Sequence, residues 1–230
     1  MNDVDDTVIR LSTGVTLDGF LEATEGAIGL VVFVHGSASS RFSVRNNRVA
    51  QILKTQGFAT LLMDLLTTRE EQMDAITREL RFNIPLLAER VVGTLDWLAQ
   101  QEAVRKVPIG LFGASTGAAA ALIAATLQPT RVGAVVSRGG RPDLAGNALS
   151  AVRAPTLLMV GSDDTQVLQL NRTAMSRIPA ETELVVIEGA THLFEEPGTL
   201  VQVAQHAADW FKRHLQRRQP IHFSSAEQRL

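Results

Sequence analysis

Cysteine is absent from this chain of 230 residues. Disulfide bonds, zinc sites built on thiolates and a cysteine nucleophile are therefore excluded, and the absence favours a cytoplasmic location. An excess of charge of one sign is also lacking, because 22 basic and 24 acidic residues leave a net charge of −2. Such a balance gives no electrostatic case for binding nucleic acid or an anionic membrane. The acidic start Met1–Asp6 has no apolar core, which argues against a signal peptide.

Linkers, internal repeats and low-complexity tracts are missing as well. We therefore expect a single domain over residues 1–216, followed by a polar tail over residues 217–230. The tail is a candidate for poor order because it is polar and lies at the end of the sequence.

Short apolar runs alternate with segments of helical periodicity along the chain. The predicted strands are an antiparallel hairpin of 8–11 and 15–20, then 30–34, 58–63, 107–112, 132–136, 156–160 and 183–187. The predicted helices lie near 46–56, 85–101, 118–127, 166–178 and 200–215. This alternation predicts an α/β fold with a mostly parallel sheet and helices on both faces. The charged connection 65–82, with Met73, Ile76 and Leu80 at helical spacing, is either a small lid or a surface helix.

The most informative stretch is Gly113–Gly117, which reads Gly-Ala-Ser-Thr-Gly and matches G-x-S-x-G. A predicted strand precedes it and an alanine-rich run follows it, which is the context of a nucleophile elbow with Ser115 at its tip. Two other interpretations stand beside this one. The uncharged run 109–127 also contains G-x-x-x-G, as membrane helices do, and a plain strand–helix turn would look similar.

Two further predicted strands end in groups that could activate a serine. Asp163 and Asp164 follow the first, and His192 follows the second after a short loop. A serine hydroxyl needs an imidazole to take its proton, and the imidazole needs a carboxylate to orient it. The order Ser, Asp, His is that of α/β-hydrolases. We favour Asp164, because G-x-x-D is the spacing typical of that fold; Asp163 then faces solvent or caps the next helix.

The segment His35–Ser40 follows a buried strand and reads His-Gly-Ser-Ala-Ser-Ser. It is similar to the loop that supplies a backbone amide to an oxyanion hole. We predict that the hole is made by the N–H groups of Thr116 and of Ser37 (or Ala38). The other interpretation is a connecting loop rich in small residues.

Arginines follow two of the predicted strands. A forked guanidinium suits a carboxylate or phosphate, so these residues are candidates for binding an anionic group of the substrate, with His35 as a further contact. The alternative is a structural role, for example a bond to Asp143. The four arginines are Arg41, Arg45, Arg138 and Arg141.

Taken together, these motifs resemble the α/β-hydrolase superfamily, and within it the dienelactone hydrolase-like group, over about residues 29–215. The resemblance implies an α/β-hydrolase fold without a large cap, no cofactor or metal, and hydrolysis of small esters or lactones. Dienelactone hydrolases carry a cysteine in the elbow, whereas this chain has Ser115, which favours an ordinary serine esterase. We therefore expect a Ser115–Asp164–His192 triad.

The expected partner is a small-molecule ester, with no nucleic acid or membrane, and the expected assembly is a monomer or homodimer. Three alternatives remain open at this point. They are a non-catalytic ligand-binding protein of the same fold, a promiscuous phosphotriester hydrolase, and a perhydrolase that uses hydrogen peroxide in place of water.

Overall fold

A computed structural model describes residues 6–215 of the chain. Within this range, eight strands form one sheet in the order β1-β2-β4-β3-β5-β6-β7-β8. The strands are β1 (Asp6–Arg10), β2 (Thr16–Glu22), β3 (Gly29–Val34), β4 (Phe58–Met63), β5 (Ile109–Ala114), β6 (Val132–Arg138), β7 (Thr156–Gly161) and β8 (Thr182–Ile187). The pairs β1–β2 and β2–β4 are antiparallel, and every other neighbouring pair is parallel. The predicted entry hairpin and the mostly parallel sheet are thus confirmed.

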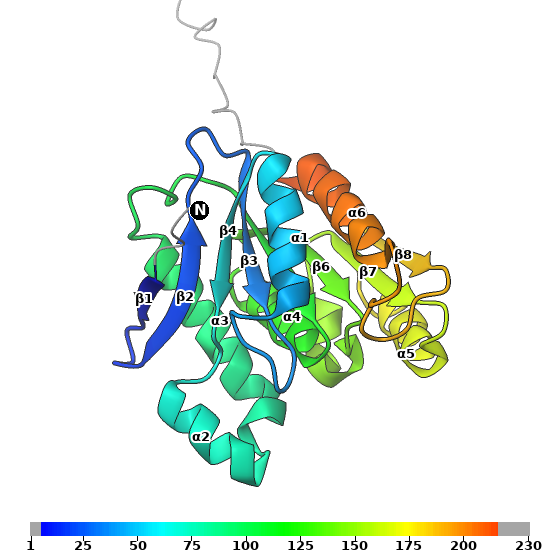
Figure 1. Cartoon of the computed structure of the whole chain (residues 1–230), viewed down its shortest axis with the longest axis horizontal. Coiled ribbons are helices and arrows are strands. Elements are labelled where there is room, and N and C mark those ends of the chain that lie inside the picture. Colours follow the sequence, from blue (N-terminus) through cyan, green and yellow to red (C-terminus); the bar gives the residue numbers. More distant parts are fainter. Residues whose placement is uncertain (1–5, 216–230) are drawn as a thin grey trace, which may run out of the picture.

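Helices cover both faces of this sheet (Figure 1). One face carries α1 (Val44–Thr55) and α6 (Thr199–His214), which pack against each other, and the other carries α3 (Ile84–Leu98) and α4 (Thr116–Leu127). The remaining helices are α2 (Thr68–Thr77) and α5 (Thr165–Met175), with two short 3₁₀ segments, η1 (Leu80–Phe82) and η2 (Pro142–Ala151). No large cap domain interrupts the described chain, so the architecture is that of an α/β-hydrolase fold.

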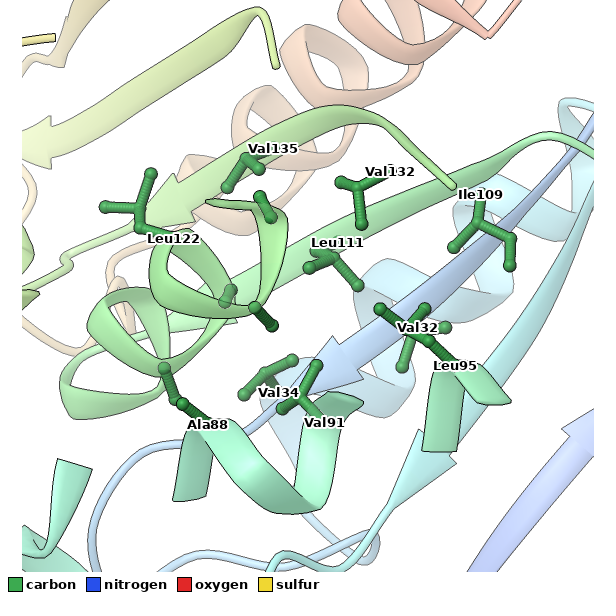
Figure 2. Packing of buried hydrophobic residues seen from close by; sticks show 14 of the residues in the cluster. Val32, Val34, Ala88, Val91, Leu95, Ile109, Leu111, Leu122, Val132 and Val135 are labelled. Carbon is green, nitrogen blue, oxygen red and sulfur yellow. The ribbon is translucent and has the colours of Figure 1, made fainter. Parts of the chain in front are cut away.

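The central strands are buried on both faces, which explains why they are continuous apolar runs. Val32, Val34 and Leu111 point to one side and meet α3 and α4, as Figure 2 shows. Phe33 and Phe112 point to the other side, toward the cluster that includes α1 and α6, with ring centroids 5.0 Å apart. Each such side chain contributes about 1.5 to 3 kcal/mol when fully buried. The two clusters make the sheet a rigid support for the loops at its carboxyl edge.

The uncharged run 109–127 divides into strand β5 and helix α4, so the membrane-helix interpretation was wrong. No helix among residues 6–215 is long and apolar enough to cross a membrane. Helix α4 is almost fully buried because its alanines let it lie close to the sheet. At Gly113 a Cβ atom would lie 2.5 Å from the Cα atom of Ala118, so a side chain there would push the helix off the strand.

Helix α2 stands away from the sheet, at the carboxyl edge of the parallel strands (Figure 1). Its start is fixed by a capping box between Thr67 and Glu70, and only Asp74 on it is buried. Met73 and Ile76, which stand at helical spacing, are 53% and 85% exposed, as the surface-helix alternative predicts. The connection 65–82 is therefore a polar surface helix anchored by hydrogen bonds and ion pairs, and it borders a cavity described below.

Candidate active site

Ser115 occupies a strained turn between β5 and α4. Its φ of 50° and ψ of −123° lie outside the regions that side chains with a Cβ prefer, at a cost of about 1 to 3 kcal/mol. Two hydrogen bonds hold the turn. The Ser115 carbonyl accepts them from the N–H groups of Ala118 and Arg141, at 3.1 and 3.0 Å. Gly117 is required because a Cβ there would lie 2.2 Å from the carbonyl oxygen of Val34. This is the geometry of a nucleophile elbow.

His192 and Asp164 form a close pair at the ends of two neighbouring strands. Asp164 follows β7, His192 follows β8, and the Nδ1 atom of His192 lies 2.6 Å from Oδ2 of Asp164. The neighbouring Asp163 is exposed and accepts a hydrogen bond from the Ser162 hydroxyl instead. Of the two candidate acids, it is Asp164 that the fold brings to the histidine.

Ser115 and His192 line the same cavity, which has a volume of about 250 Å³. Its wall also includes Ser37 of the loop after β3, Arg45 of α1 and Arg138 at the end of β6. These residues come from distant parts of the chain and meet at the carboxyl edge of the sheet, where ligands bind in open α/β folds. The volume suits a small molecule.

A second cavity of about 280 Å³ lies on the other side of the same loop. The two cavities share Gly36, Ser37 and Ser39, and the second extends under α2 to Leu65 and Glu71. Burial and the nearby Asp64 and Asp18 carboxylates raise the pKa of Glu71, against the opposing charge of Arg41. Residues of the loop His35–Ser40 therefore line both cavities.

The candidate oxyanion hole is partly occupied by the protein itself. The N–H of Thr116 is at the first position of α4, where no intrahelical acceptor exists. The N–H of Ser37, however, donates to Oγ1 of Thr116 at 2.9 Å. Both predicted residues are therefore at the elbow, but in this state the Ser37 amide is bonded to a side chain. Ala38, the alternative donor, adjoins it with a φ of 55°.

His35 lies in the same loop but is used internally. Its Nδ1 lies 2.9 Å from the Gly36 carbonyl oxygen, and its Nε2 accepts from the N–H of Leu65 at 3.2 Å. Burial lowers the pKa of this imidazole, so it is neutral at neutral pH. Both ring nitrogens are taken, and the ring ties the loop after β3 to the loop after β4. The structure thus gives His35 a structural position and offers a substrate neither nitrogen.

Two of the four candidate arginines are held by carboxylates outside the Ser115 cavity. Arg41 donates to Asp64 through both its backbone N–H and its side chain. Arg141 forms a two-bond fork with Asp143, at 2.8 and 2.7 Å, which is the alternative that the sequence left open. Neither Arg41 nor Arg141 lines the Ser115 cavity, and neighbouring acids bond their guanidinium groups, so contact of either with a substrate stays a prediction.

Arg138 and Arg45 do reach the Ser115 cavity. Burial and the positive charge of Arg45 lower the pKa of Arg138 to about 10, so its guanidinium is charged at neutral pH. Asn46, which the sequence did not single out, lies against it: Nη2 of Arg138 is 3.3 Å from the Asn46 side-chain oxygen. No local motif marks an asparagine 92 positions away as a neighbour, so only the fold could reveal it.

Elsewhere in the described chain, other possible ligand sites lack the chemistry of the elbow. A larger cavity of about 830 Å³ lies at the opposite edge of the sheet, near Pro108 and Val132, and contains neither Ser115 nor His192. Among residues 6–215, no group of three histidine or acidic side chains is arranged to hold a metal ion. The carboxyl edge of the sheet is therefore where we place the active site.

The fold and the elbow together define an α/β-hydrolase. The sequence model of the Dienelactone hydrolase family matches residues 18–219, and the chain belongs to this family. A dienelactone hydrolase of Anabaena variabilis ATCC 29413 is 51% identical in sequence. Its crystal structure superposes with a TM-score of 0.89 over 92% of this chain and 99% of that one.

More distant structures and one pair of sequences complete the comparison. An esterase of Pyrococcus furiosus is 17% identical and superposes with a TM-score of 0.71, over 92% of this chain and 91% of its own, which shows a shared fold. Two strains of Mycobacterium tuberculosis, CDC 1551 and H37Rv, have a protein named "Putative phosphoribosyl transferase" that is 54% identical over 211 residues. That match covers 92% of this chain but only 47% of the relative, so the chain spans about half the relative's length.

Proposed function

We propose that this protein is a serine hydrolase that cleaves small carboxylic esters or lactones through an acyl-enzyme on Ser115. The observation that carries the proposal is geometric. Ser115 at the strained elbow and His192, paired with Asp164 at 2.6 Å, line one cavity of about 250 Å³. Membership of a hydrolase family supports the same reaction class.

The residues divide the chemistry among them. Asp164 accepts a hydrogen bond from the Nδ1–H of His192, which fixes the tautomer with Nε2 unprotonated and able to take the Ser115 proton as the hydroxyl attacks the ester carbonyl. His192 then protonates the leaving alcohol, and in the second half of the reaction it activates the water that releases the acid.

Negative charge develops on the carbonyl oxygen during both attacks. The Thr116 N–H, at the positive end of α4, is one donor in the proposal. The second is the Ser37 N–H, whose present acceptor, the Thr116 hydroxyl, is replaced by the substrate oxygen; Ala38 is the alternative. The Thr116 hydroxyl thus keeps a donor in place before substrate binds.

Phosphoribosyl transfer, named for the Mycobacterium relative, is not part of this proposal. The chain matches less than half of that protein, and the matched part has the hydrolase fold and elbow described above. The name of the relative therefore carries no phosphoribosyl transfer over to this chain.

The direct test is turnover of aryl acetates by wild type, Ser115→Ala and Ser150→Ala, where Ser150 is an exposed serine outside the cavity. The proposal predicts that Ser115→Ala loses at least about 10³-fold in kcat, while Ser150→Ala matches wild type. Full activity of Ser115→Ala would overturn it.

Peracid formation from acetate and peroxide would identify a perhydrolase, and cleavage of phosphotriesters would identify a promiscuous phosphotriester hydrolase. Tight ligand binding without turnover would favour a binding protein.

A further inference from the structure

The cavity of about 830 Å³ lies at the amino edge of the sheet, opposite the active site. The loops that precede β5, β6 and β7, three neighbouring strands, form its rim, and we call it the amino-edge cavity. Ile109, the first residue of β5, lines it, whereas Ser115 follows the last residue of the same strand. The length of β5 therefore separates the two sites, which is about 20 Å of extended chain. A small molecule held in the amino-edge cavity is out of reach of the nucleophile.

The wall of the amino-edge cavity carries charge of one sign. Arg105, Lys106, Arg131 and Arg153 line it, and none of its lining residues is an aspartate or a glutamate. Arg131 is bonded to Asp96 at 3.0 Å. The other three cations take part in none of the ion pairs found among residues 6–215. A concave wall of one sign attracts counter-ions.

The sequence of the protein itself offers no obvious source for that counter-ion. The whole chain has a net charge of −2, so a wall without acids does not follow from a general excess of basic residues. The stretch 216–230, which comes directly after the described residues, has three arginines and one glutamate, and by charge it does not complement this wall. The cavity is therefore suited to an anion that comes from outside the chain.

The unpaired cations lie on two sides of the amino-edge cavity. Arg105 and Lys106 precede β5, Arg153 precedes β7, and β6 lies between these two strands. Strands two places apart in a sheet are about 10 Å apart, so long side chains from both loops meet at one multiply charged group between them. A guanidinium fork fits the oxygens of a phosphate, and a lysine adds a point charge.

The rest of the wall favours an anion that also has an organic part. The carbonyl oxygens of Pro108 and Pro155, which would repel an anion, already accept hydrogen bonds from the N–H groups of neighbouring strands. Leu95, Ile109 and Val132 form an apolar floor at the beginning of β5 and β6 (Figure 2). The volume of the cavity lies within the range of about 300 to 1,000 Å³ that is typical of small-molecule sites and exceeds the needs of a bare phosphate.

We propose that the amino-edge cavity binds a phosphorylated small molecule. Its phosphate lies between Arg105, Lys106 and Arg153, and its organic part lies on the apolar floor. This binding site is separate from the hydrolase function proposed above and does not depend on it.

Calorimetric titration of the whole protein with pyrophosphate, adenosine 5′-monophosphate and adenosine tests the proposal. Potassium chloride at about 0.15 M screens weak attraction to the surface. We expect saturable binding of both phosphate compounds. Adenosine 5′-monophosphate should bind at least about tenfold more tightly than adenosine, since each hydrogen bond between charged groups contributes that much or more.

Single substitutions show whether the probes bind in this cavity. Arg105→Gln, Lys106→Gln and Arg153→Gln should each weaken the binding of both phosphate compounds by at least about tenfold. These three side chains are exposed, so the substitutions leave the core intact. Arg172→Gln is the matched control, an exposed arginine on α5 outside the cavity, and it should keep the wild-type affinity. Ser115→Ala should keep it as well.

Three results would each overturn the proposal. The first is that neither phosphate compound shows saturable binding to wild type. The second is that Arg172→Gln weakens binding as much as Arg153→Gln does, which indicates general attraction to a basic surface. The third is that Ser115→Ala or labelling of Ser115 abolishes binding, which places the probes at the elbow. Loss of affinity in the three cavity variants alone supports the site whether or not any ester is hydrolysed.

Discussion

Nδ1 of His192 lies 2.6 Å from Oδ2 of Asp164, whereas the adjacent Asp163 is turned to solvent and bonded to Ser162. Two acids that are neighbours in sequence thus have different surroundings. Asp164→Asn should lower kcat for an aryl acetate by about 10³- to 10⁴-fold, because the amide cannot hold the imidazole in the required tautomer. Asp163→Asn is the matched control and should stay within about threefold of wild type, a surface change that touches no reacting group. A larger loss in Asp163→Asn than in Asp164→Asn would contradict this assignment.

The bond from the Ser37 amide to the Thr116 hydroxyl predicts a stability effect at the elbow. Thr116→Val keeps the shape of the side chain but removes the acceptor, so the free energy of unfolding should fall by about 1 to 2 kcal/mol. Thr116→Ser keeps the hydroxyl and should be closer to wild type. Urea denaturation of the three proteins measures the difference, and equal midpoints for Thr116→Val and wild type would show that the bond contributes nothing.

Burial of His35 predicts a pH dependence of stability. Its pKa is lowered in the folded protein, so as pH falls below the ordinary value of about 6.5 the unfolded chain binds a proton that the folded chain does not. Stability should therefore fall by about 1 kcal/mol from this residue between pH 7 and pH 5.5, and recover as pH rises.

The variant that isolates this effect is His35→Gln, compared with His206→Gln at an exposed position on α6. Denaturation curves at both pH values should show a smaller acid loss in His35→Gln than in wild type, with His206→Gln following wild type. If all three proteins lose the same stability on acidification, His35 is not the group responsible.

Most of the fold could be predicted because its strands carry their own local signal. The run 30–34 is apolar throughout and lies within β3, and the run 58–63, apolar except for Thr60, coincides with β4; both strands are buried on both faces. Helix α4 was predicted from composition, since a helix buried all round shows no periodicity. The segment η2 was not predicted, because Gly146, with a φ of 56°, interrupts it and leaves no regular pattern to read.

The sequence was less informative where polar contacts, rather than apolar burial, decide the structure. Met73 and Ile76 have helical spacing, yet α2 is anchored through Asp74, which bonds Arg81 and the backbone N–H of Leu80. The helical spacing predicted a helix here, but the hydrophobic pattern alone did not decide between a lid and a surface helix. The tail 217–230 lies outside the described residues.

The residues of the candidate site that belong to short sequence motifs could be predicted. The contacts of side chains that pair with residues far away in the sequence could not. Ser115, Asp164 and His192 each follow a strand, so the topology itself brings them to one edge. The arginines gave no such guide. Arg41 is bonded to Asp64, 23 positions away, whereas Arg138 has no acid partner among the described residues. Only the folded structure shows this difference between the two arginines.

The most direct test of the account is covalent labelling by a fluorophosphonate, followed by intact mass and peptide mapping of wild type, Ser115→Ala and His192→Ala. The account predicts one adduct on Ser115 in wild type, none in Ser115→Ala, and labelling slowed by at least about 10³-fold in His192→Ala, because the hydroxyl is then without its base. Folded wild-type protein that takes up no label at Ser115, or that labels equally fast without His192, would contradict the claim that this site holds an activated serine.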